Sequence, residues 1–492
     1  MFVFQDHELE RILDMIITNM TPQRSPSQKP VPANLLFLSA RYAHYHASPE
    51  LLHTLLSSAA DKINDVVERH QWDMTMQAFW LSNATLLLHY LKKDGGLVES
   101  TIEFQLHLVE LINEIFVLII RDAERRMNKV LDAAMLDHET IPGLEDIAFQ
   151  NEWKLFRKKK SEAPEPAEKR FRPPSPRRRA QISPRNITSL LSSTLFVLDL
   201  YDVHSVITTQ ILSQLIYWLS AEIFNRIMTT KRYLARTKAM QIRMNVSALE
   251  DWARVNNRQP EHYENGSMTS TGENTADAAR RHLAPVIQLL QWLQCFSSLG
   301  DDYESLITTL LQLQQLFPNQ LLHAVKQYRP EVGEKGLTKK SMKLLLDFQR
   351  DPDVLFREQQ KIEEEKAKAA AAAATAAASE TATDERPKTP TKDQQGQTAP
   401  DSLATPDPGQ GSPGSTASSR PASMIAAKMD ERPSNASVFL DPTLFLPFSL
   451  PTSTDMLISY GAGLGGTNRE RARKYIPTVP PEVLSRFDRS DV

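Results

Sequence analysis

The amino-acid sequence predicts an all-α protein that also carries long disordered segments. Apolar residues recur at intervals of three and four over residues 34–141, and again from residue 187 to about residue 254, which is the spacing of a buried helix face. The sequence contains no alternation of strand, turn and helix and no repeat of fixed period, which disfavours a Rossmann-like sheet and a solenoid. Long stretches rich in Pro, Ser, Thr, Gly and Gln are typical of disorder.

Length and charge limit the class of protein. A single hydrophobic core rarely grows beyond about 250–300 residues, so a chain of 492 residues should divide into subdomains or carry long tails. The net charge of −3 and the pI near 6.5 argue against a nucleic-acid-binding surface over the whole protein. We therefore expect no nucleic-acid partner.

Cysteine usage and hydropathy favour the cytoplasm. The single cysteine, Cys295, cannot form an internal disulfide, and the N-terminus lacks the pattern of a signal peptide. The apolar run at residues 108–120 is interrupted by Glu110, Asn113 and Glu114. It is also shorter than the roughly 18 apolar residues that a membrane-spanning helix requires.

An N-terminal helix and linker are expected over residues 1–30, followed by a first helical subdomain over residues 31–153. Residues 79–91 are apolar around most of the helix circumference, which predicts a central helix. The Asp-Gly-Gly sequence at residues 94–96 should end this helix, because glycine accepts the left-handed conformation of a helix C-terminus. A further helix should bury one stripe, formed by Ile102, Leu106, Val109, Ile112, Phe116, Ile119 and Ile120.

Residues 154–186 combine basic residues with prolines and few apolar groups, which predicts a basic disordered loop. The loop is either a solvated linker or a patch for anionic lipid or an acidic partner. Phosphorylation at Ser175 or Ser183, each followed by proline, would weaken such a patch. The basic residues of the possible patch are Arg157, Lys158, Lys159, Lys160, Lys169, Arg170, Arg172, Arg177, Arg178 and Arg179.

A second helical subdomain is expected over residues 187–353. Residues 257–275 are polar and suit a connection, and the next helix should span residues 283–296 with Pro285 in its first turn. The first long helix of this subdomain should bury a broad stripe, formed by Ile211, Leu212, Leu215, Ile216, Leu219, Ile223, Phe224 and Ile227.

The C-terminal part divides by composition. Residues 354–379 predict a charged and alanine-rich helix, and residues 380–437 a disordered linker. Residues 438–460 contain an apolar, proline-containing island that should dock on the helical body as an extended strap, because exposed phenylalanines would otherwise favour aggregation. Residues 461–492 are expected to form a tail.

A search for reaction centres finds no catalytic, cofactor-binding or metal-binding pattern. Residues 461–466 satisfy Gly-x-Gly-x-x-Gly, but they lie in a low-complexity tail instead of between a strand and a helix, which favours a flexible linker. His44, His46 and His53 should be ordinary surface or half-buried residues, and Cys295 a small core residue. We expect a protein without enzymatic activity and without a cofactor.

Residues 238–252 read Lys-Ala-Met-Gln-Ile-Arg-Met-Asn-Val-Ser-Ala-Leu-Glu-Asp-Trp, which is similar to the Gln-Ile-Arg-x-Asn-x-Ser-x-Leu-Glu-x-Trp pattern of dilute (DIL) domains. Residues 32–37, 79–83, 135–141 and 223–225 resemble other segments of that family, in the same order. The chain thus resembles the cargo-binding globular tail of class V myosins over roughly residues 30–350. The resemblance implies an elongated helical bundle of two packed subdomains that binds adaptor proteins or small GTPases.

The residues that carry the resemblance are mostly apolar or helix-capping, so we expect them to hold the fold in the first place and to touch a partner only in some cases. These signature residues are Phe79, Trp80, Asn83, Asn225, Met240, Arg243, Asn245, Leu249 and Trp252. The sequence lacks a motor, light-chain-binding repeats and a heptad coiled coil, so movement along actin is not expected. We expect a cargo-binding or tethering protein at organelle or vesicle surfaces, or alternatively a peripheral membrane protein that binds anionic lipid through its basic loop.

Overall fold

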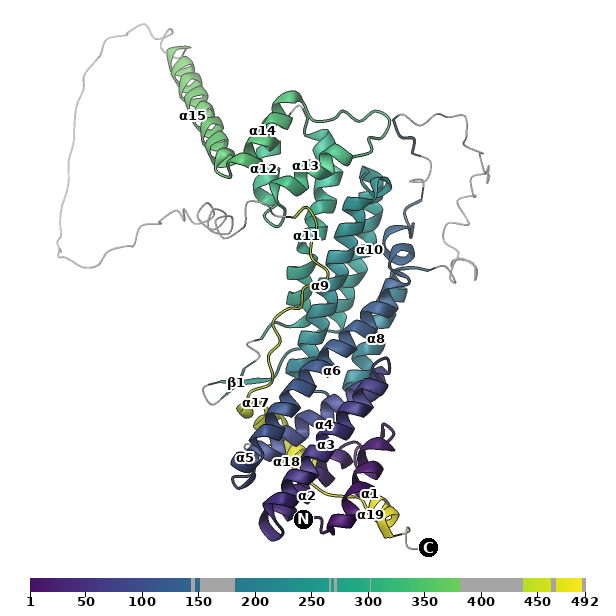
Figure 1. The fold of residues 1–492 in the computed structure, drawn as a ribbon. Helices are drawn as coiled ribbons and strands as arrows, with labels where there is room; N and C mark the ends of the chain where they lie inside the picture. Colours follow the sequence, from purple (N-terminus) through teal and green to yellow (C-terminus); the bar gives the residue numbers. More distant parts are fainter. Residues whose placement is uncertain are drawn as a thin grey trace, which may run out of the picture. The chain divides into compact units, whose positions relative to one another are not determined.

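The computed structural model describes residues 1–142, 147–150, 182–264, 267–269, 272–300, 302–380, 437–461 and 466–488 (Figure 1). The chain forms two compact units. Unit 1 comprises residues 1–294, 324–333 and 439–492, and unit 2 comprises residues 295–323 and 334–438. Helices dominate the described part of both units, so the predicted all-α class is confirmed.

The helices of unit 1 come from three parts of the sequence. The N-terminal part contains η1 (Asp6–Glu8), α1 (Leu9–Leu13), η2 (Asp14–Thr18), α2 (Val31–His46), α3 (Pro49–Arg69), α4 (Met74–Lys93), α5 (Leu97–Ser100), α6 (Ile102–Asn128) and η3 (Asp132–Leu136). The middle part contains α8 (Pro184–Leu200), α9 (Ser205–Thr229), η7 (Lys231–Tyr233), α10 (Arg236–Val255) and most of α11 (Thr275–Cys295). The C-terminal part contains α17 (Ser453–Ser459), α18 (Gly466–Lys474) and α19 (Pro481–Asp488).

Helix α4 is the central helix that the sequence predicts for residues 79–91. Asp73 caps its N-terminus by accepting hydrogen bonds from the Thr75 and Met76 amides at 3.0 and 3.3 Å. The helix ends at Lys93 as predicted, but neither Gly95 nor Gly96 has the expected left-handed backbone. Gly96 serves a close approach instead, because a Cβ there would lie 2.2 Å from the Tyr45 hydroxyl oxygen.

Helix α6 packs against α4 and α9, but its buried stripe differs from the predicted one in the first turns. Ile102 and Leu106 are 59% and 61% exposed, so their assignment to the buried stripe was wrong. The N-terminal part of the helix buries Phe104 and Leu108 instead. Two helix faces carry apolar residues in this region, and only the neighbouring helices decide which face is covered.

Helix α9 is buried on almost all sides, and every residue of its predicted stripe is buried. The helix begins after His204, whose Nδ1 accepts a hydrogen bond from the Val206 amide at 3.2 Å. Helices α6 and α8 pack against it, which places α9 inside unit 1. The helix therefore offers a rigid support for any side chain that reaches its one accessible face.

The segment between α10 and α11 differs from the prediction in two ways. Strands β1 (His262–Glu264) and β2 (Ser267–Thr269) form an antiparallel hairpin where a plain connection was expected, with Tyr263 opposite Met268. Helix α11 begins at Thr275 and not near Leu283, so Pro285 lies inside the helix instead of in its first turn. Proline lacks one helical hydrogen bond there, and tertiary packing outweighs this loss because Leu283, Val286 and later residues of the helix are buried.

Unit 2 contains η8 (Phe296–Ser298), α12 (Tyr303–Gln312), the first part of α13 (Pro318–Gln327), α14 (Lys339–Arg350) and α15 (Val354–Glu380). Helix α12 packs against α15. Asp302 and Thr338 cap α12 and α14 by accepting the Ser305 and Ser341 amides at 2.9 and 3.2 Å. The alanine-rich segment is helical, as predicted.

The C-terminal segment returns to unit 1, as the strap prediction requires. Residues 440–452 run as irregular extended chain with one turn before α17 begins. The segment beyond residue 461 is not the simple tail that was expected. Helix α18 binds the body through Arg471 and Glu261, and α19 places the Phe487 ring 5.3 Å from the Phe2 ring. Between the two helices, the Asn34 carboxamide donates to the Thr478 carbonyl at 2.8 Å, and the Tyr90 hydroxyl donates to the Tyr475 carbonyl at 3.1 Å.

Two predicted segments lie largely outside the described residues: the basic loop, except residues 182–186, and the linker, except its two end residues. Among the helices that the structure describes, none is both long and apolar enough to cross a membrane.

Candidate protein-interaction surface

The strap, defined here as residues 438–452, lies along α9 and runs antiparallel to it (Figure 1). The Gln210 carboxamide makes two hydrogen bonds with Ser449, to its amide and its carbonyl, both at 2.8 Å. One turn further along the helix, the Gln214 carboxamide accepts from the Leu446 amide at 2.8 Å and donates to the Leu444 carbonyl at 3.0 Å. Both glutamines thus bind strap main chain through donor and acceptor together.

Two more side chains of α9 continue this row. The Tyr217 hydroxyl donates to the Asp441 carbonyl at 2.8 Å. The Asn225 carboxamide accepts from the Leu440 amide at 2.9 Å and donates to the Leu440 carbonyl at 2.8 Å. The four polar side chains share one helix face because their spacing follows the helical period. We call them the polar row: Gln210, Gln214, Tyr217 and Asn225.

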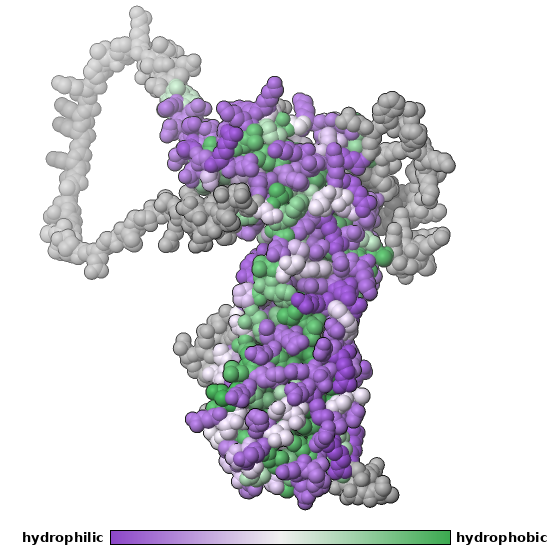
Figure 2. All heavy atoms as spheres, in the orientation of Figure 1, coloured by the Kyte–Doolittle hydropathy of each residue, from purple (hydrophilic) through white to green (hydrophobic). Residues whose placement is uncertain are grey.

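The side chains of strap residues 438–450 are at most partly buried against the body. The Phe448 ring stacks on Phe116 of α6, with centroids 4.2 Å apart. Phe439, Leu444 and Phe445 remain 40%, 49% and 36% exposed. On the face drawn in Figure 2, apolar residues gather along the path that the strap follows in Figure 1.

A cavity of about 630 Å³ lies beside the strap, which forms one wall through Leu446, Pro447 and Ser449. The lining also includes the polar side chains of Ser213, Glu273, Arg281 and His282. His282 Nε2 lies 3.0 Å from the Ser213 hydroxyl, and burial lowers the pKa of His282 to about 4, with a smaller contribution from the positive charge of Arg281. His282 is therefore neutral at pH 7.

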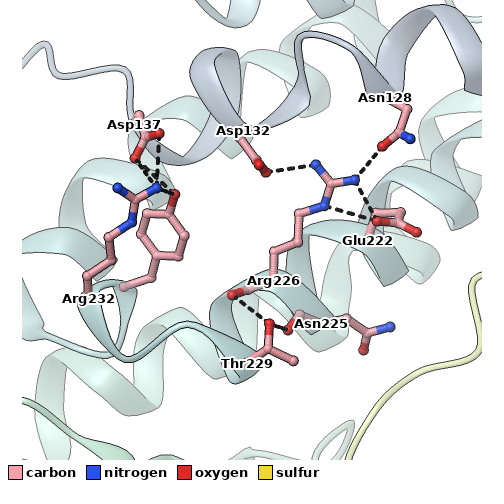
Figure 3. Close-up of polar contacts among 9 residues, drawn as sticks. Asn128, Asp132, Asp137, Glu222, Asn225, Arg226, Thr229 and Arg232 are labelled. Carbon is pink, nitrogen blue, oxygen red and sulfur yellow. Dashed lines mark hydrogen bonds and ion pairs between the residues drawn. The ribbon is translucent and has the colours of Figure 1, made fainter.

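Beyond the polar row, Arg226 joins the end of α9 to η3 (Figure 3). Its guanidinium binds Asp132 at 2.7 Å and Glu222 at 2.8 Å, and also contacts Asn128. Next to it, Asp137 accepts from the Tyr233 hydroxyl at 2.9 Å and pairs with Arg232 at 3.3 Å. Each of these charged side chains has an oppositely charged partner within the fold, so the ion pairs hold neighbouring elements together.

Four of the signature residues lie inside the body of unit 1. Phe79, Trp80, Leu249 and Trp252 are buried, and the Trp252 indole donates to the Ser192 hydroxyl at 2.8 Å. Met240 is exposed, and Arg243 pairs with Glu250 at 2.7 Å.

Two signature asparagines bind main chain far away in sequence. The Asn83 carboxamide accepts from the Ala33 amide at 3.2 Å and donates to the Lys29 carbonyl at 3.1 Å. The Asn245 carboxamide donates to the carbonyls of Met135 and His138 at 3.0 and 2.9 Å. Asn225, in the polar row, is the signature residue that contacts the strap.

The other residues that the sequence analysis singled out do not come together in one site within the described part of the chain. The possible anionic-partner patch lies outside them. His44 contacts Ser100, His46 stacks on Tyr42, and no group of metal-binding side chains occurs in the part of the chain that the structure describes. Burial raises the pKa of the Cys295 thiol to about 11, which keeps it protonated and poorly reactive.

Sequence reasoning did not identify Gln210, Gln214 or Tyr217. A signal exists, because two carboxamides stand one turn apart in a helix rich in apolar residues, and a buried carboxamide requires partners for both its donor and its acceptor. The sequence cannot say that these partners come from a segment more than two hundred residues away.

The family model described as "DIL domain" matches residues 210–332, so its match begins at the first residue of the polar row. This chain carries a DIL domain. The resemblance inferred from the sequence is thereby confirmed. The match covers most of α9 together with α10, β1, β2, α11, α12 and α13, and all four residues of the polar row belong to it.

Relatives that align with 61–71% of this chain include other proteins named for this domain. A dilute domain-containing protein of Schizosaccharomyces pombe is 34% identical over 357 residues, which are 71% of this chain and 60% of the relative. One of Saccharomyces cerevisiae is 24% identical over 464 residues, covering 70% and 52%. Human unconventional myosin-Vb is 25% identical over 330 residues, covering 61% and 16%. The chain thus spans only about half to three fifths of the two dilute-domain relatives.

Solved structures share the fold. The structure titled "Myosin V cargo binding domain" has a TM-score of 0.52 at 15% identity, covering 71% of this chain and 84% of that one. The structure of Myo2-GTD in complex with Inp2 has a TM-score of 0.51 at 14% identity, covering 71% and 82%. The DIL domain of this chain therefore belongs to a helical body with the myosin V globular-tail fold.

Proposed function

We propose that this chain is a non-enzymatic protein-interaction module that binds cargo or adaptor proteins in intracellular transport. The observation that carries the proposal is the polar row of α9, which lies within the DIL domain and already holds an extended protein segment by its main chain. Grooves on helical proteins commonly bind short segments of partners in this way.

The comparisons support the same class of function. A structure with this fold is described as a cargo-binding domain, and another, Myo2-GTD, is described in complex with Inp2. For this chain, we propose adaptor proteins as partners, with small GTPases as a second class. We place the protein in the cytoplasm, at organelle or vesicle surfaces, because such partners act there. The alternative of anionic-lipid binding depends on residues outside the described part of the chain, and no contact favours it.

The proposal is tested by proximity labelling in cells with the full chain. We expect recovery of transport adaptors, and a clear loss of part of that set when Gln214 is replaced by alanine, because the polar row then loses two of its hydrogen bonds with main chain. The control is Met240→Ala, a change at an exposed residue outside the row. A full chain that labels no transport protein, or one that turns over a substrate, contradicts the proposal.

A further inference from the structure

We infer that the polar row is a binding site for extended segments of other proteins, and that the strap is its resident occupant, which a partner segment displaces. This inference rests on the proposed function and adds to it the location of the site, the chemistry of the partner segment and the competing contact. The partner segment would be extended, with apolar residues and nearby prolines, as the strap is.

The first argument concerns what α9 recognises. Its polar row makes seven hydrogen bonds to the strap, and all seven end on main-chain atoms. Main-chain groups are common to every protein segment, so such a row does not depend on strap sequence. Any extended segment that places amides and carbonyls at the same intervals can satisfy the same four side chains.

The second argument concerns the positions of the prolines. The amides that bind the polar row belong to Leu440, Leu446 and Ser449. Prolines, which have no amide hydrogen, occupy positions 442, 447 and 451, and the polar row accepts no main-chain hydrogen bond from these positions. Prolines at these positions disfavour a helix and restrict the unbound segment to extended conformations, which lowers the entropy lost on binding. The same arrangement would suit a partner segment.

The third argument concerns the strength of the resident contact. No side chain from residue 438 to residue 450 is fully buried, although most are apolar. The hydrophobic contribution therefore rests on partly buried residues, above all on Phe448 against Phe116. In contrast, the C-terminal anchor beyond the strap packs Met456 and Tyr460 into the body. The strap can leave the polar row while that anchor stays in place.

The connection between the strap and the C-terminal anchor decides how strongly the strap competes with a partner segment. Helix α17, which carries Met456, begins at Ser453, directly after the strap. Because this connection is short, a detached strap competes at an effective concentration on the order of 1 mM. A partner segment must overcome this competition, so binding should be weak while the strap is intact and stronger when the strap is weakened.

A fluorescent peptide with the sequence of residues 438–451 tests the inference on the full chain. We expect Phe448→Ala, which removes the stacking contact, to raise the affinity of the chain for the peptide at least tenfold. Phe445→Ala is the matched control, since this ring is partly exposed on the same strap, and should bind the peptide as the unchanged chain does. Leu446→Ala replaces Phe448→Ala should the latter chain fail to fold.

Two further peptides separate main-chain recognition from side-chain recognition. A peptide methylated on the Leu446 nitrogen should bind at least tenfold more weakly, because it cannot donate to Gln214. A peptide with valine in place of Leu444 and Phe445 should bind within about threefold, since these side chains are exposed. Equal binding of the first peptide to Phe448→Ala and unchanged chains, or full binding of the methylated peptide, overturns the inference.

Hydrogen exchange provides an independent measurement. The Leu440 and Leu446 amides should exchange at least tenfold faster than amides in the middle of α9, and a competing peptide should speed their exchange further, because it displaces the strap. Strap amides as slow as those of α9 overturn the inference. If these tests fail but proximity labelling still recovers adaptors, the polar row is not the binding site and the proposed function stands. If proximity labelling recovers no transport protein, the proposed function is wrong, whatever the peptide experiments show.

Discussion

At the scale of single residues, long-range carboxamide contacts organise unit 1. Gln241 accepts from the Thr140 and Ile141 amides at 2.9 and 3.0 Å, and Asn245, one turn later, binds two carbonyls of the same segment. These two residues of the signature motif therefore hold the chain segment at 135–141. The described contacts give a physical reason why these side chains stand at this spacing.

Asn245→Ala should lower the free energy of unfolding by about 2–3 kcal/mol, because it removes three hydrogen bonds: those to the carbonyls of Met135 and His138 and the one from the Gln241 carboxamide. The measurement is chemical denaturation followed by circular dichroism. Met240→Ala on the same helix is the control and should change stability by less than about 0.5 kcal/mol. Equal stabilities of the two variants would contradict the assigned role of Asn245.

Two histidines should make the stability of unit 1 depend on pH. Burial lowers the pKa of His89 from 6.5 to about 4, helped by the charges of Lys93 and His204, and burial lowers the pKa of His282 similarly. The unfolded chain then binds these protons more readily than the folded chain. Stability is therefore fully present above pH 6.5 and is lost as pH falls toward 4.

We expect a loss of about 1 kcal/mol for each histidine between pH 7 and pH 5.5, somewhat less for the more accessible His282. Denaturation at both pH values measures this loss. His89→Gln should reduce the difference between the two, while His44→Gln, a control at a more exposed position, should leave it unchanged. A His89→Gln chain with the full pH dependence would exclude the neutral state assigned to this residue.

At the scale of elements, contacts with residues distant in sequence shape the end of α4 and the exposed face of α9. Helix α4 ends at the predicted residue, yet the glycine beside it is needed for the Tyr45 hydroxyl, which also donates to Asp94 at 2.6 Å. Likewise, α9 is buried on nearly every side, and the polar row on its remaining face binds the main chain of the strap. Each element thus combines a locally determined helix with one feature that a distant residue imposes.

Gly96→Ala should lower the free energy of unfolding by about 1 kcal/mol, since the new Cβ displaces the Tyr45 ring and breaks its hydrogen bond with Asp94. Gly95→Ala is the matched control, because a Cβ there meets no atom within 4 Å, and it should be neutral or slightly stabilising. Thermal unfolding of both variants measures the difference. A destabilised Gly95→Ala chain together with an unaffected Gly96→Ala chain would refute this explanation.

At the scale of the whole molecule, segments at opposite ends of the sequence build one unit. The Phe2 and Phe487 rings lie 5.3 Å apart, Lys474 binds Asp202 at 2.9 Å, and Arg471 binds Glu261 through both of its terminal nitrogens at 3.1 Å. The strap, α17, α18 and α19 together therefore form a C-terminal arm bound to the body of unit 1.

Proteolytic cleavage within residues 381–436 should leave the two fragments associated. The arm keeps its contacts through Tyr475, Thr478 and the buried Met456 even if the strap exchanges on and off the polar row. Size-exclusion chromatography after limited proteolysis should therefore recover the C-terminal fragment with the body. Replacement of Tyr460, which is buried beside His89, by alanine should promote release of the fragment. Immediate separation of the unchanged fragments would show that the arm is not docked.

Sequence periodicity predicted the helices most reliably where a helix is buried over most of its surface, as in α4 and α9. The predictions were wrong where the neighbouring helices decide which face of a helix is buried or where a helix begins. Ile102 and Leu106 were assigned to the core because the repeat continued through them, although the neighbouring helices leave them exposed. Pro285 was assigned to a helix start, since a local rule cannot weigh one missing hydrogen bond against the packing of a long apolar face.

The sequence by itself determined the all-α class, the DIL domain, the helical stripes and the existence of an apolar segment that had to dock somewhere, because these depend on local periodicity, composition and a contiguous motif. Tertiary structure alone decided where that segment docks, which side chains bind it, that residues 262–264 and 267–269 pair as antiparallel strands and that the C-terminal helices pack on the body. Such contacts join residues that are far apart along the chain, and their free energy depends on shape and on paired donors and acceptors that no local pattern encodes.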